Sequence, residues 1–177
     1  MNAASHADLC LWNAALVGQW RTLAHAFEAP GRPRFGLLVG PHLRHVLEHH
    51  EALLWPALPG LVRYDDRPRD AQVEREPALA VRRLARVEAL LRQPHRLPSL
   101  DAALAVELRV GLQGERNASL ASSFGRELAM VGSHAVHHLA LVVEHCQTYA
   151  IPLPADAGRA PATVAHARAA LQPVQET

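Results

Sequence analysis

Histidine is the residue type whose number and spacing stand out in this sequence. The chain has 12 His in 177 residues, and seven of them fall in two short clusters, at residues 42–50 and 134–138. His42, His45 and His49 are spaced three and four residues apart, so a helix would carry them on one face. His134 and His138 are four residues apart and would share a face of a second helix. These columns predict a metal site, because imidazole is a common ligand of divalent transition metals.

Two histidines from one helix and a third from a neighbouring helix can supply three nitrogens to one ion. Three protein ligands leave one coordination position of the ion open, and an open position distinguishes a catalytic metal from a structural one. A single H-x-x-x-H pair often occurs by chance, but burying two columns of imidazoles without a metal requires partners for every ring nitrogen. The spacing therefore predicts a divalent-ion site that takes His134 and His138 from one helix and one or more of His42, His45 and His49 from the other, with His49 a further candidate beside a set of three. His42 remains an alternative ligand or an orienting partner.

Other polar side chains near the two histidine clusters have two possible roles each. Glu48 and Glu144 could orient imidazoles, although a glutamate on a helix surface is more often solvated. Tyr64, Arg67 and Arg69 could reach the site and bind an anionic substrate. The interpretation favoured here for that charged segment is a surface ion-pair network.

The remaining assignments are simpler. His50 is expected to face solvent, and Trp12, Trp20 and Trp55 are expected in the core. Ser122 and Ser123 are expected to cap the last long helix, and no catalytic nucleophile is identified.

Apolar residues recur every three to four positions in four long segments, which predicts four helices. The expected helices run over residues 8–28, from 35 or 37 to 58, from 77 to before 94, and 124–149. Residues 59–76 are polar and interrupted by proline, so they are expected to form a long connection. A short helix over 162–171 should pack outside the others.

Residues 103–110 alternate between apolar and polar types before a glycine-containing turn and a polar run that ends at residue 123. This pattern predicts a small β-hairpin inserted before the last long helix. Since helices dominate, the predicted fold is all-α, a four-helix bundle with this hairpin, in one domain over residues 1–177.

Composition excludes several classes of function. The formal charge is +1 with no basic face, so nucleic-acid binding is not expected. No signal peptide or membrane span is evident, and Cys10 and Cys146 lie in apolar helical patterns, which favours reduced thiols in a cytoplasmic protein.

Four stretches together resemble the DinB-like (DinB/YfiT) superfamily, in an uncharacterised bacterial branch. They are Gly40 to His49 (GPHLRHVLEH), Tyr64 to Asp70 (YDDRPRD) with Glu74, Arg126-Glu127-Leu128 leading to Ser133 to His138 (SHAVHH), and Gly158 to Thr163 (GRAPAT).

This resemblance implies a four-helix bundle and a zinc or nickel ion held by His45 with His134 and His138. It also implies a homodimer and relation to thiol S-transferases that use bacillithiol, mycothiol or glutathione. The first hypothesis is thus a metal-dependent transferase or hydrolase acting on a small-molecule thiol or electrophile. The alternative is a non-catalytic metal-binding or stress-response module, and the third is a helical interaction protein with a histidine-rich core.

Overall fold

The computed structural model describes residues 4–32 and 34–171. Within them lie six α-helices, three 3-10 helices and three β-strands. The α-helices are α1 (His6–Ala26), α2 (Val39–Leu54), α3 (Ala71–Arg75), α4 (Pro77–Leu91), α5 (Phe124–Thr148) and α6 (Pro161–Ala170). The strands are β1 (Leu61–Arg63), β2 (Ala103–Val110) and β3 (Arg116–Ser123), and the 3-10 helices are η1 (Phe35–Leu37), η2 (Tyr64–Asp66) and η3 (Pro94–Arg96).

Capping residues set where the helices that carry the site begin. The Ser123 side chain accepts a hydrogen bond from the Arg126 N–H, which starts α5 where the sequence predicted it. Pro77 occupies the first turn of α4, where its missing N–H costs nothing. Pro41 lies in the first turn of α2, so the second predicted helix is not kinked by it.

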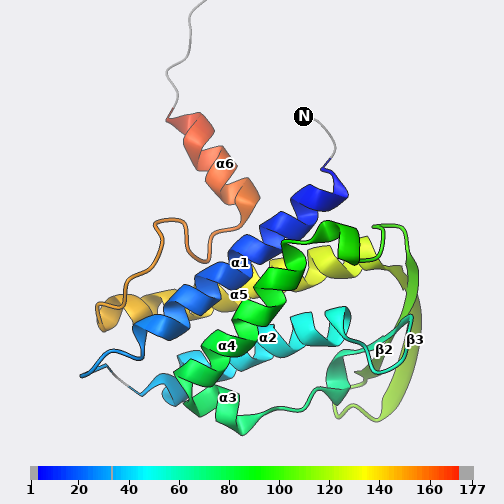
Figure 1. Cartoon of the computed structure of the whole chain (residues 1–177), viewed down its shortest axis with the longest axis horizontal. Helices are drawn as coiled ribbons and strands as arrows, with labels where there is room; N and C mark the ends of the chain where they lie inside the picture. The colour runs from blue at the N-terminus through cyan, green and yellow to red at the C-terminus, as the bar shows by residue number, and fades with distance from the viewer. Residues whose placement is uncertain (1–3, 33, 172–177) are drawn as a thin grey trace, which may run out of the picture.

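The long helices pack against one another around one cluster of buried side chains. α1 lies along α4, and α2 packs on both α4 and α5 (Figure 1). Trp20, Leu47, Leu84 and Leu128 are fully buried where these helices meet. The prediction for the tryptophans is confirmed for Trp20 alone, because Trp12 is half-buried and Trp55 is 37% exposed.

The predicted all-α four-helix-bundle class is wrong, because a three-stranded mixed sheet is part of the fold. The expected hairpin is present as β2 and β3, but β1 adds to it in parallel, with Val62 opposite Val106. Both valines are buried, so this pairing adds apolar surface to the core. β1 lies in the stretch that was predicted to be a connection, and three residues are too few to show an alternating pattern.

The sheet lies at the end of the helical layer where α5 begins, and α6 projects at the top of the view, away from the sheet (Figure 1). α6 has no fully buried residue, which agrees with the expectation of a helix outside the others. None of the helices in the described ranges is long and apolar enough to cross a lipid bilayer.

Candidate metal centre

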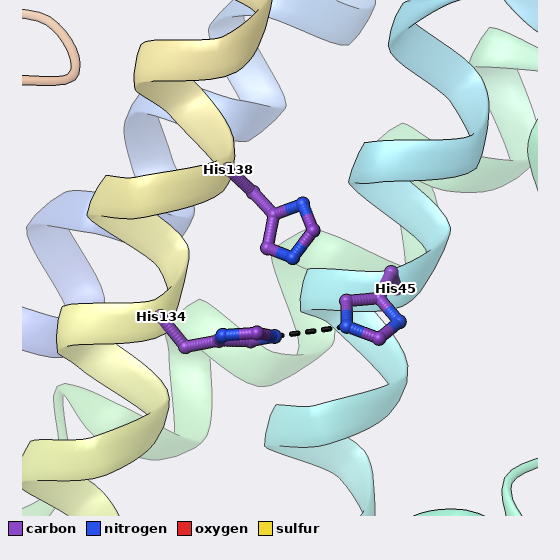
Figure 2. Close-up of side chains that lie close together, drawn as sticks. All are labelled: His45, His134 and His138. Carbon is purple, nitrogen blue, oxygen red and sulfur yellow. Dashed lines mark hydrogen bonds between the residues drawn. The ribbon is translucent and has the colours of Figure 1, made fainter. Parts of the chain in front are cut away.

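The packing of α2 against α5 brings the two histidine clusters face to face. Nε2 of His45 lies 2.8 Å from Nε2 of His134 (Figure 2). His138, one turn further along α5, turns its ring toward the same point (Figure 2). One nitrogen from each of His45, His134 and His138 lies within 4.8 Å of the others, and all three side chains are half-buried. The predicted convergence of imidazoles from separate parts of the chain is therefore observed.

The outer ring nitrogens have other partners, which identifies the nitrogens that face the centre. Nδ1 of His138 lies 2.7 Å from Nδ1 of His42, and Nδ1 of His45 lies 3.2 Å from Nη2 of Arg67. Each of these histidines therefore has its Nε2 left for the centre. His42 thus lies behind His138, where it would orient that ring rather than bind the ion itself.

The donor set fits a zinc or nickel ion. Two nitrogens bound to zinc at tetrahedral angles, each about 2.1 Å from the ion, lie about 3.4 Å apart. The Nε2 atoms of His45 and His134 are 2.8 Å apart, which is closer than in such a complex. The ligand nitrogens of the three histidines are separated by up to 4.8 Å, which is wider than in such a complex. Imidazole rotations that move the nitrogens by about 1 Å would satisfy both, and three imidazoles suit these borderline ions.

Burial keeps these imidazoles neutral, as metal ligands must be. Desolvation, together with the charges of the neighbouring His49 and Arg67, lowers the pKa of His45 to about 3. Desolvation also lowers the pKa of His138 to about 3, with His134 as the next cause. The pKa of His134 is lowered for the same first reason. Near pH 7 the three rings therefore offer lone pairs.

His49, the further candidate, lies beside this group and not in it. Its Nδ1 donates to the His45 carbonyl oxygen at 2.6 Å, and its Nε2 accepts from Nη1 of Arg67 at 3.2 Å. Its ring stacks on Tyr64, with centroids 5.3 Å apart. Both nitrogens of His49 are thus in use, and its ring forms a wall of the site.

Arg67 reaches the histidine cluster from the segment between β1 and α3. The preferred interpretation of this residue as part of a surface ion-pair network is wrong, because 9% of its side chain is exposed and its guanidinium contacts two imidazoles. Glu48 fixes the segment: its carboxylate accepts the backbone N–H of Arg69 and of Asp70, at 3.2 and 2.8 Å. Glu48 therefore positions Arg67 and does not orient an imidazole, while Glu144 is exposed.

His50 is fully buried, so the expectation that it faces solvent is wrong. Its Nδ1 donates to the Val46 carbonyl oxygen at 2.9 Å, and its Nε2 lies 3.2 Å from Oδ1 of the buried Asn13. A signal for this burial exists in the sequence, because Val46, His50 and Leu53 are spaced four and three residues apart and share one face of α2.

Comparisons with known proteins assign no family. No protein-family model matches the chain, and no solved structure matches it. Among curated proteins, FK506-binding protein 5 of Rhizopus delemar is 28% identical over 119 residues, which cover 66% of this chain and 31% of that protein. The chain thus spans about a third of the length of this relative. The resemblance to the DinB-like superfamily stays a prediction.

Proposed function

We propose that the protein binds a divalent metal ion, zinc or nickel, through His45, His134 and His138 and uses it as an enzyme. The observation that carries this proposal is the convergence of three neutral imidazoles from two helices. When bound, such an ion would lower the pKa of a thiol or water that reaches it. The proposed reaction class is accordingly thiol S-transfer to an electrophile, or hydrolysis.

The residues around the three histidines have roles that suit this chemistry. His42 accepts a hydrogen bond from Nδ1 of His138 when Nε2 of His138 faces an ion, which holds the ring in place. Arg67 brings a positive charge to the edge of the site, where it can attract an anionic substrate. Glu48 and Tyr64 hold Arg67 in this position through the adjoining backbone.

The proposal also includes a distant relationship between this chain and the DinB-like superfamily. One histidine of α2 and an H-x-x-x-H pair on α5 form the set that this resemblance implies, which supports it. A homodimer and a cytoplasmic location belong to the proposal, and the second is supported by Cys10 and Cys146, both of which are free and buried.

A non-catalytic metal-binding module is the alternative, and one observation favours it. The Arg67 guanidinium is a donor beside Nδ1 of His45, whereas a ring that binds metal through Nε2 carries its proton on Nδ1. The two donors would face each other, so Arg67 must shift when the ion binds. A side chain that moves when the ion binds is what an ion-sensing module requires, whereas catalysis does not need it.

Metal analysis of the purified protein tests the proposal. We expect one zinc or nickel ion per chain, loss of that ion in His45→Ala and in His134→Ala, and retention in the exposed His166→Ala control. Protein that takes up neither ion under these conditions would contradict both functions.

Turnover then separates the two functions. Conjugation of bacillithiol, mycothiol or glutathione to bromobimane should be faster with the metal-loaded protein than with His134→Ala. Stoichiometric ion without any such acceleration, and without ester hydrolysis, would favour the non-catalytic module.

A further inference from the structure

A cavity of about 420 Å³ lies next to the histidine cluster, and nothing in the proposed metal site uses it. Its wall is formed by the second half of α2, the turn that follows, β1, the segment after β1 and one side chain of α4. This volume is within the range of small-molecule sites in proteins. The lining residues are Glu48, Glu51, Ala52, Trp55, Pro56, Ala57, Leu58, Leu61, Arg63, Asp66, Arg67, Pro68 and Arg86.

Arg67 is the side chain that the cavity and the histidine cluster share. Its terminal nitrogens contact His45 and His49, and Arg67 is also among the residues that line the cavity. Its buried Nε–H has no hydrogen-bond acceptor in the described part of the chain. The nearest carboxylate oxygen, Oε2 of Glu48, is 3.9 Å away. A buried donor without an acceptor is costly, and a small shift of the Arg67 side chain that lets an anion in the cavity accept this N–H would remove that cost.

The lining also includes an aromatic face and a second cation. The Arg86 guanidinium lies 4.5 Å from the centre of the Trp55 ring. Among residues 4–32 and 34–171, no carboxylate forms a salt bridge with Arg86. Trp55 is 37% exposed and Leu58 is 49% exposed, so the wall has apolar surface available to a ligand.

Most carboxylates of the lining are already neutralised. Glu51 pairs with Arg83, a residue outside the cavity wall. Glu48 accepts two backbone N–H groups. Asp66 is exposed to solvent, which screens its charge. Of the lining cations, Arg63 pairs with Glu107, Arg67 lies 3.9 Å from Glu48, and Arg86 forms no salt bridge in the described part of the chain. Arg86 and Arg67 are therefore the cations that the lining offers to a ligand.

We propose that this cavity binds a small organic anion with a flat apolar body. The carboxylate of such a ligand would accept hydrogen bonds from Arg67 and Arg86, and its ring would lie on Trp55. The site is built from residues that do not ligate the ion, so binding does not require metal. In a loaded protein the anion would lie one side chain away from the histidine centre.

Titration of metal-free protein with 2-naphthoate tests this proposal, with the neutral 2-naphthamide as the matched probe. We expect naphthoate to shift the NMR resonance of the Trp55 indole N–H and to leave the resonance of the buried Trp20 in place. The Trp55 resonance is identified by its absence from the spectrum of Trp55→Phe. The amide should bind at least about tenfold more weakly, because it lacks the charge that both arginines recognise. Arg86→Gln should weaken naphthoate binding by about tenfold, whereas Arg82→Gln, exposed on the same helix and outside the cavity, should not.

Equal affinity for the acid and the amide would overturn the proposal, as would equal loss in the two arginine variants. Absence of any Trp55 shift would also overturn it. Since the titration uses protein stripped of metal, it can succeed when the proposed metal function fails, and it can fail when that function holds.

Discussion

Nδ1 of His42 on α2 lies 2.7 Å from Nδ1 of His138 on α5. One of these nitrogens must donate and the other accept, and a His138 that binds an ion through Nε2 is the donor. His42→Phe removes the acceptor without removing a ligand. Zinc should still bind with one ion per chain, but its affinity should fall by about 10- to 100-fold, the usual cost of losing such a partner.

Competition with a chromophoric chelator measures this change. His137→Ala is the matched control, because His137 is adjacent to His138 but exposed. The zinc affinity of this variant should equal that of the wild type. Loss of stoichiometric zinc from His42→Phe would instead make His42 a ligand.

Arg67 limits how tightly an ion can bind, because its guanidinium lies 3.2 Å from Nδ1 of His45. In Arg67→Gln the positive charge is gone, so zinc affinity should rise by about tenfold. The variant should also unfold at a lower temperature, since Glu48 is buried and loses its neighbouring cation. Calorimetric titration and thermal unfolding measure the two effects, with Arg69→Gln as the exposed control. Unchanged or weaker zinc binding would contradict the electrostatic role assigned to Arg67.

Tyr64 joins the sheet segment to α5. Its hydroxyl donates to Oε2 of Glu127 at 3.0 Å, and both side chains are buried. Tyr64→Phe removes a hydrogen bond to a charged group and leaves that carboxylate with one donor fewer, so the free energy of unfolding should fall by about 1.5–3 kcal/mol. Urea denaturation measures it. Tyr149→Phe, at the exposed end of α5, should change stability by less than about 0.5 kcal/mol.

The long helices could be predicted from the sequence because each repeats its apolar period over many residues. α4 and α5 begin where Pro77 and Ser123 indicate. The spacing of the histidines placed each cluster on one face of its helix, and the expected packing of the helices brought the two faces together. β1 could not be predicted, because its three residues become a strand only through pairing with β2. The fold class was wrong for this reason.

Side chains that act across the fold were harder to predict than the histidines. The position of Arg67 depends on Glu48, which accepts backbone N–H groups of residues more than 20 positions later in the chain. No local pattern encodes that contact. His50 shows the opposite case: its helical spacing from Val46 and Leu53 indicates burial, although it was expected to face solvent.

His50 should make stability depend on pH. Desolvation lowers its pKa in the folded protein from 6.5 to about 4, although its hydrogen bond to the Val46 carbonyl acts in the other direction. Below pH 6.5 the unfolded chain therefore takes up a proton at His50 that the folded chain does not, and this favours unfolding. The stability that the folded protein gains from a neutral His50 is fully present above pH 6.5 and is lost as the pH falls toward about 4.

The difference corresponds to roughly 3 kcal/mol at this site. Replacing His50 by Gln, which does not titrate, should flatten the dependence between pH 6.5 and 4 by about that amount, even if the variant is less stable at pH 7. Urea denaturation of metal-free protein across this range measures the slope, with the exposed His166→Gln as the control. A slope in His50→Gln equal to that of the wild type would show that other groups cause the acid sensitivity.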